Sequence, residues 1–244
     1  MDNRVKCVLH ICFVVLVYTA LFELAFIGGA DSLEQDPAVN LLTAISGVPA
    51  AEMFTEDKQM IIKWITAASL LFILAGREVY ERLNQLKYMA VHRYGSYRKF
   101  YYSLMNRTTV CAVLYGGVGI LITYALYFLH GNGEVGNLPF LKMGMIYLAN
   151  ILLLCLLQTL CMILTQGYTA GIVLLVAWFL VIFCGHWLLE TKWIFLPSEW
   201  GMYLRSAEQI QGGVPDIAYL IQGCICALIW LVSPVILSKR KKIG

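Results

Sequence analysis

The sequence predicts an all-α, polytopic membrane protein with six transmembrane helices and both termini in the cytoplasm. The 244 residues are 60% hydrophobic and 14% charged, with a mean hydropathy of +0.72, whereas soluble domains are about 45–50% apolar and about 25% charged. The apolar residues form six runs, each near the ~17–25 residues that span a hydrocarbon core as a helix. The runs cover residues 8–28, 60–76, 108–129, 143–165, 169–189 and 217–237. They leave only short connections, so residues 1–244 are expected to form a single domain.

The positions of the basic residues predict the orientation in the cell membrane. Most of the 18 lysines and arginines lie before the first run, between the second and third runs, and after the last run. Cytoplasmic loops are enriched in Lys and Arg, so the termini and residues 77–106 are predicted to face the cytoplasm. The first run is also open to interpretation as a signal peptide, although about 20 residues exceed the ~7–15 of a signal h-region.

The segment between the second and third runs has helical periodicity. Apolar residues recur at steps of three and four, which is one face of a helix; they are Val79, Leu83, Leu86, Ala90, Tyr94, Tyr97 and Tyr101. The pattern predicts an amphipathic helix that breaks near Gly95 and Ser96. Two interpretations stay open: a helix lying on the inner membrane surface, or a docking surface for a cytoplasmic partner.

Polar residues inside the runs are few. Glu23 and Lys63 lie near the outer ends of the first two runs, and a charge in apolar surroundings is costly unless paired, so an ion pair is predicted. Gly116, Gly117 and Gly119 are expected to allow close helix packing. Two roles stay open for Asn150, Gln158, Thr159 and Gln222: hydrogen bonds between helices, or the lining of a path. The eight cysteines lie within or beside the runs, where free cysteine behaves as a small hydrophobe, so no disulfide is predicted.

The connection between the last two runs, at about residues 190–215, predicts a short outer helix. Ser198 is in position to cap it, with Trp200, Tyr203 and Leu204 in an apolar stripe and Glu199 and Arg205 on the opposite, polar side. One interpretation is an interfacial helix with its aromatic residues at the headgroups. The other is a possible outer gate formed by the three stripe residues over a translocation path.

Motifs for catalysis are missing from the sequence. There is no G-x-x-x-x-G-K-[ST] phosphate-binding loop, no G-x-S-x-G elbow and no H-E-x-x-H zinc motif. The sequence therefore predicts no catalytic residues, no bound metal and no cofactor on this chain.

Two stretches lie directly before the third apolar run: Arg77-Glu78-x-x-x-x-Leu83 and His92-Arg93-x-Gly95-Ser96-x-Arg98-Lys99-Phe100. Together they resemble the coupling-helix region of six-helix permeases of type-2 ATP-binding-cassette exporters. The resemblance implies a cytoplasmic coupling helix at about residues 77–103. It implies as partners a cytoplasmic ATPase, which would hold ATP and Mg, and a second permease subunit, the same or a sister chain. The residues predicted to form the ATPase contact in this segment are Glu78, Glu81, Arg82, Leu83, Leu86 and Lys87.

The function expected from this resemblance is the permease subunit of an ATP-driven exporter. The acidic first outer loop would suit a cationic peptide, as in peptide or bacteriocin transport, and another amphipathic cargo stays open. The alternative is a non-transporting accessory, sensor or scaffold subunit that recruits a cytoplasmic partner. A neighbouring gene for an ATPase with the phosphate-binding loop would favour the exporter.

Overall fold

The computed structural model describes residues 3–28, 42, 44–47, 58–86, 93–130, 140–189, 196–209 and 212–240. Within them the chain is all-α, as predicted, and the only extended pairing is an isolated bridge between Ser206 and Val214. The long helices are α1 (Asn3–Gly28), α3 (Lys58–Leu86), α5 (Tyr97–His130), α6 (Phe140–Thr165), α7 (Thr169–Leu189) and α8 (Asp216–Arg240).

Each of the six predicted apolar runs lies within one of these helices. Four helices are long and apolar enough to cross a membrane, over Val5–Leu24, Tyr97–Leu129, Phe140–Thr165 and Asp216–Lys239. In α7 the described apolar stretch is shorter, Thr169–Ile182. The structure is thus compatible with a helical membrane protein, and the figure of six crossings stays a prediction.

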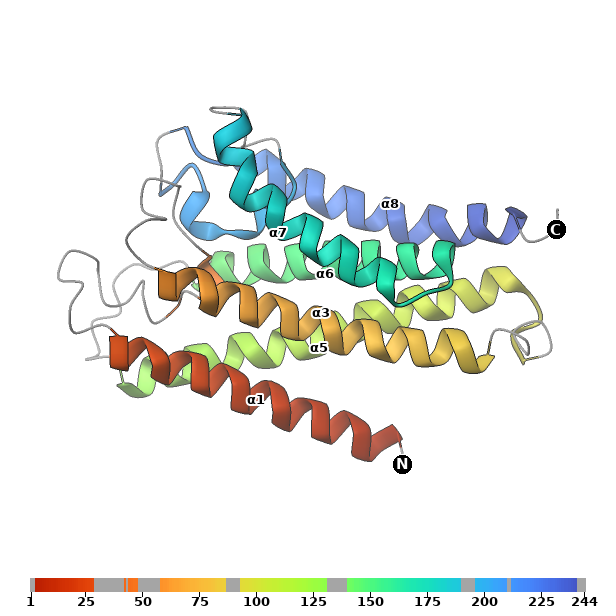
Figure 1. The fold of residues 1–244 in the computed structure, drawn as a ribbon, viewed down its shortest axis with the longest axis horizontal. Helices are drawn as coiled ribbons and strands as arrows, with labels where there is room; N and C mark the ends of the chain where they lie inside the picture. The colour runs from red at the N-terminus through yellow and green to blue at the C-terminus, as the bar shows by residue number, and fades with distance from the viewer. Residues whose placement is uncertain are drawn as a thin grey trace.

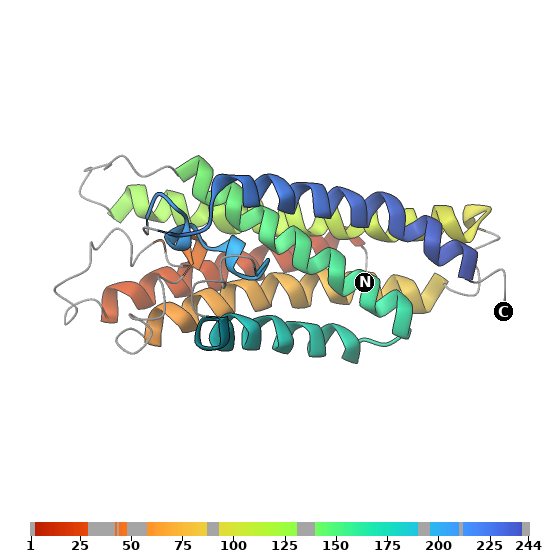
Figure 2. The ribbon, with the colours of Figure 1, turned by 90° about the horizontal axis from the view of Figure 1, so that it is seen from above.

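The helices lie side by side and alternate in direction, so α1 begins and α8 ends towards the same end of the bundle (Figure 1, Figure 2). With 34 residues, α5 is about 51 Å long at ~1.5 Å per residue, well beyond the ~30 Å of a hydrocarbon core. In both views the end of α3 and the start of α5 project past α6 and α7. We call this end, which the sequence predicts to be cytoplasmic, the inner end.

Helix α6 forms the centre of the bundle. In its apolar stretch 67% of the residues are buried, against 22% in α1 and in α8, which matches a helix that is hydrophobic on all sides. Tyr147 of α6 lies against Tyr18 of α1, with 2.5 Å between the two hydroxyl oxygens. Thr159 shares a hydrogen bond of 2.7 Å with Thr108 of α5, which confirms that Thr159 bonds between helices.

Two of the three glycines of α5 allow close helix packing, as predicted. A Cβ on Gly116 would lie 2.8 Å from a methyl group of Leu148, and one on Gly119 would lie 2.5 Å from the ring of Tyr18. Gly117 faces open space, with no atom within 4 Å of such a Cβ. The prediction for Gly117 is therefore wrong, because the α5 helix turns this residue away from its neighbours.

Replacing Gly119 by alanine should destabilise the protein by about 1–3 kcal/mol, the usual cost of overpacking a filled site. The added methyl meets Tyr18, which is 1% exposed and held by Tyr147, so the ring has little room to move. Gly117→Ala is the matched control and should be neutral or stabilising by up to about 1 kcal/mol, because alanine favours a helix. Unfolding of the detergent-solubilised protein measures both, and equal effects would contradict this packing.

The predicted amphipathic segment is divided between two long helices. Residues 77–86 continue α3 without interruption, and α5 begins at Tyr97 after a bend in which Gly95 has a φ of +73°. The predicted break is confirmed, and residues 87–92, between the two helices, lie outside the described residues. The helix continues because the apolar face of α3 persists past Gly76, with Val79 and Leu83 buried against α5 and α6.

This apolar stripe faces the inside of the bundle. Val79, Leu83 and Tyr101 are 0%, 4% and 4% exposed, in a cluster with residues of α6 and α8 such as Leu153 and Leu237. The side chain of Leu86 and all of Ala90 lie outside the described residues. Val79, Leu83 and Tyr101 thus fill the core, and Tyr94 and Tyr97 pack partly buried against it.

The outer connection differs from the predicted single helix. It contains two short 3₁₀ turns, Glu199–Gly201 and Tyr203–Arg205, and the Ser198 side chain caps neither. Glu199 and Arg205 form an ion pair with each other, with side chains 0% and 2% exposed. The prediction that these two residues lie on a water-facing side is wrong, because pairing lets both charges enter the bundle.

The predicted ion pair between Glu23 and Lys63 has its two members in different surroundings. Glu23 is exposed on α1, whereas Lys63 of α3 is 4% exposed. The ion pairs of the described residues do not join the two side chains. The pairing of Glu23 with Lys63 stays a prediction.

Candidate functional site

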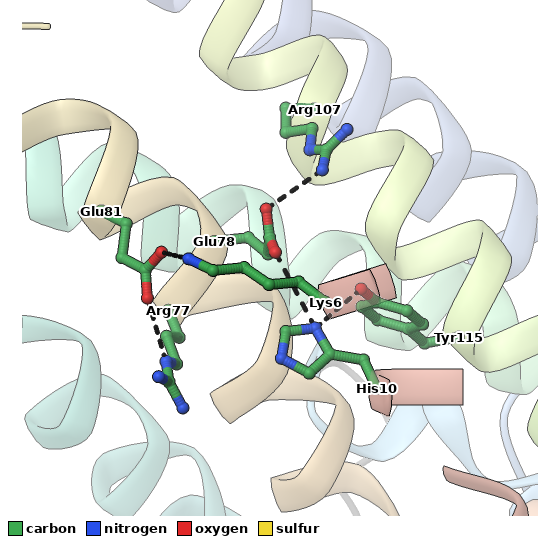
Figure 3. Close-up of polar contacts among 7 residues, drawn as sticks. All are labelled: Lys6, His10, Arg77, Glu78, Glu81, Arg107 and Tyr115. Atoms are coloured by element: carbon green, nitrogen blue, oxygen red, sulfur yellow. Dashed lines mark hydrogen bonds and ion pairs between the residues drawn. The ribbon is translucent and has the colours of Figure 1, made fainter. Parts of the chain in front are cut away.

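Charged and polar side chains of three helices meet near the inner end of the bundle (Figure 3). We call this group the inner charged cluster. It consists of Lys6 and His10 of α1, Arg77, Glu78 and Glu81 of α3, and Arg107 and Tyr115 of α5.

Glu78 holds the centre of the inner charged cluster. One carboxylate oxygen accepts a hydrogen bond of 3.1 Å from Nη2 of Arg107, and the other lies 3.8 Å from Nδ1 of His10. The same His10 nitrogen is 3.0 Å from the Tyr115 hydroxyl. The side chain of Glu78 is only 12% exposed, so a single carboxylate connects α3 to both α1 and α5 in partly dry surroundings.

Glu81 makes a second, more exposed connection one turn further along α3. It accepts hydrogen bonds from Lys6 of α1 at 2.7 Å and from Arg77 at 3.1 Å. These bonds, that of Lys6 first, lower the pKa of the Glu81 carboxyl below its usual value. Its side chain is 32% exposed, and exposed ion pairs contribute only about 0–1 kcal/mol. Glu78 is therefore the stronger of the two connections.

Helical spacing explains why these residues meet. Lys6 and His10 are four apart on α1, and Glu78 and Glu81 are three apart on α3, so each pair shares one helix face. Arg107 lies just before the third apolar run. Arg107 and His10 were not predicted as site residues. The signal that could have identified them is their position at the edge of an apolar run, where an ionisable side chain needs a partner.

The predicted coupling residues are distributed over three environments. Glu78 and Glu81 belong to the inner charged cluster, and Leu83 is buried in the core. Arg82 is half-exposed, and its neighbours Asn84 and Gln85, which were not among the predicted coupling residues, are exposed. The Leu86 side chain and Lys87 lie outside the described residues.

The predicted gate residues are buried at the opposite end of the bundle. Trp200, Tyr203 and Leu204 are 7%, 2% and 8% exposed, and Trp200 packs on the start of α8. Nδ2 of Asn150 donates to the carbonyl of Pro197 at 3.3 Å, which ties the connection to α6. Lys142 adds ion pairs of 2.5 Å to Glu208 and 2.9 Å to Asp216, joining α6, the connection and α8.

The fold and the site together define a helical bundle, compatible with a membrane, whose inner end is joined by ion pairs. No protein-family model, no curated protein and no solved structure matches the chain. Over the residues that the structure describes, no three His, Cys, Asp or Glu side chains gather as metal ligands would. The inner charged cluster can act as a mechanical link, because its ion pairs join the end of α3 to α1 and α5.

Proposed function

We propose that this chain is the permease subunit of an ATP-driven exporter in the cell membrane. It crosses the bilayer six times with both termini in the cytoplasm, pairs with a second permease chain, and is driven by a cytoplasmic ATPase. The observation that carries the proposal is that residues 77–86 extend α3 directly and are joined to α1 and α5 by the inner charged cluster.

This arrangement suits a coupling element. A partner that contacts residues 77–86 differently in its two nucleotide states biases the helices between two arrangements, because only differential contact shifts a conformational equilibrium. Through Glu78 and Arg107, which lie 3.1 Å apart, a displacement of α3 acts on α5. Through Glu81 and Lys6, at 2.7 Å, it acts on α1. The packed connection around Trp200 and Tyr203 is the part that opens to release a peptide or other amphipathic cargo.

The docking surface of this proposal is narrower than the resemblance implies. Glu78 and Leu83 face the bundle, so the contact falls on the exposed side of the α3 end, at Arg82, Asn84 and Gln85. The inward position of Glu78 and Leu83 equally suits a non-transporting accessory or scaffold subunit, which needs a recruiting surface but no path.

Reversing the charge of Arg82 tests the docking surface. Like charges brought together at an interface cost several kcal/mol, so Arg82→Glu should reduce co-purification of the proposed ATPase partner by about tenfold or more. Arg93→Glu is the matched control: it makes the same charge change at an exposed position near the inner end and should leave binding unchanged. If the ATPase binds both variants like the wild type, the α3 end is not its docking surface.

A further inference from the structure

Two cavities lie in line along the seam between α5 and α8. One, of about 500 Å³, is mainly apolar and is lined by Asn106, Thr109, Leu152, Leu156, Gly223 and Ala227, among others. The other, of about 610 Å³, lies between the start of α5 and the end of α8 and is lined by Ser96, Tyr97, Arg98, Val235, Ser238 and Lys239, among others. We call them the apolar groove and the basic cleft.

The apolar groove and the basic cleft lie on the same faces of the two helices. Residues four apart share a helix face, and the α8 lining follows this step from the groove into the cleft through Gly223, Ala227, Leu231, Val235 and Lys239. On α5 the same step relates Arg98 of the cleft to Asn106 of the groove, through Tyr102. The two cavities therefore form one strip along the seam.

Aromatic contacts lie where the two cavities meet. The Tyr102 hydroxyl donates to the carbonyl of Leu231 at 2.8 Å, and its ring lies 5.6 Å from that of Trp230. The guanidinium of Arg98 lies over the Tyr102 ring at 5.7 Å. This stack holds Arg98 on the seam, at the mouth of the cleft.

The basic cleft has the chemistry of an anion site. Arg98 and Lys239 are exposed, and no carboxylate of the described residues forms an ion pair with either. The sequence has no Asp or Glu between Glu81 and Glu134, and none after Asp216. Hydroxyl groups of Ser96 and Ser238 line the same cleft and add hydrogen-bonding capacity.

The apolar groove has the length of an acyl chain layer. Gly223 to Leu231 spans about 12 Å at ~1.5 Å per residue, close to one leaflet, which is half of a ~30 Å hydrocarbon core. A Cβ on Gly223 would have no atom within 4 Å, so this part of the groove is open. An amphiphile with an anionic head and an apolar tail matches both the charge and the order of the two cavities.

We propose that the α5–α8 seam binds an anionic phospholipid of the inner leaflet, with its phosphate at Arg98 and Lys239 and one acyl chain in the apolar groove. Basic pockets between transmembrane helices on the cytoplasmic side are known to hold such headgroups. This site does not depend on the proposed ATPase partner, since it lies on the chain's own seam.

Native mass spectrometry of the purified full chain tests the proposal, with phosphatidylglycerol and phosphatidylcholine of the same acyl chains added in turn. The wild type should bind phosphatidylglycerol at least tenfold more tightly. One basic residue near an anionic headgroup changes binding about fivefold, so replacing both Arg98 and Lys239 by glutamine should remove this preference. The control replaces Arg93 and Lys99 by glutamine, which removes the same charge at exposed positions outside the cleft, and should keep it.

Two further measurements separate a lipid site from its alternatives. Gly223→Leu with Ala227→Leu fills the groove and should weaken phosphatidylglycerol binding while Arg98 and Lys239 remain. Free glycerol phosphate should not compete at the concentration of the lipid. Three results would each overturn the proposal. They are an equal loss of the phosphatidylglycerol preference in the Arg93 and Lys99 control, undiminished phosphatidylglycerol binding to the filled groove, and effective competition by glycerol phosphate.

Discussion

Replacing Arg205 by leucine should lower the free energy of unfolding by about 3–5 kcal/mol, the usual cost of removing one member of a buried ion pair. The side chains of Glu199 and Arg205 are 0% and 2% exposed, so the Glu199 carboxylate would stay buried without its counter-charge. Its second oxygen already has no hydrogen-bond partner among the described residues. A buried, uncompensated carboxylate is the reason for the large effect.

The double variant Glu199→Gln with Arg205→Leu should recover much of this loss, because an uncharged side chain is cheaper to bury than an unpaired charge. The matched control is Glu208→Gln, which breaks an ion pair with Lys142 in which Glu208 is 47% exposed. It should cost less than about 1 kcal/mol. Thermal or denaturant unfolding in detergent measures the stability of all three variants. If Arg205→Leu is as stable as Glu208→Gln, the buried ion pair is contradicted.

Replacing Glu78 by glutamine should cost about 2–3 kcal/mol, because a hydrogen bond to a charged group contributes about 1.5–3 kcal/mol and Glu78 also faces His10. Among the described residues, Nε of Arg107 has no hydrogen-bond partner, and Glu78 is the carboxylate that pairs with Nη2. The guanidinium would therefore lose its anionic contact within the described part of the chain. The 31% exposure of Arg107 keeps the effect below that of Arg205→Leu, since water partly compensates the lost charge.

Glu81→Gln is the matched control for Glu78→Gln, on the same helix and one turn away. Its partners Lys6 and Arg77 are 27% and 64% exposed, so the expected cost is below about 1 kcal/mol. The same unfolding measurement compares the two variants. Similar losses for both would show that Glu78 is not the main connection of the inner charged cluster.

Periodicity and length predicted the helices well, because both depend on neighbouring residues. Each apolar run lies in one helix, and the bend falls at Gly95, where a φ of +73° favours glycine. The stripe containing Val79 and Leu83 was recognised as one helix face. Its burial was not, since an apolar stripe looks the same whether a membrane or a neighbouring helix covers it.

Contacts between residues far apart in the sequence could not be predicted from local sequence patterns. Lys6 and Glu81 are 75 positions apart, and their pairing depends on how α1 and α3 rotate against each other. At the outer connection the pattern around Glu199 assumed that charges face water, and a mutual pair between Glu199 and Arg205 removes that requirement.

Under the proposed function, a cytoplasmic ATPase acts on the bundle through the inner end of α3. The most direct test is the rate of ATP hydrolysis by a candidate ATPase, one that carries the phosphate-binding loop and is encoded by a neighbouring gene, measured with and without the chain in lipid nanodiscs. The wild-type chain should change this rate, Arg82→Glu should abolish the change, and Arg93→Glu should preserve it. If the ATPase binds the wild-type chain but its rate of ATP hydrolysis does not change, the proposed coupling is contradicted.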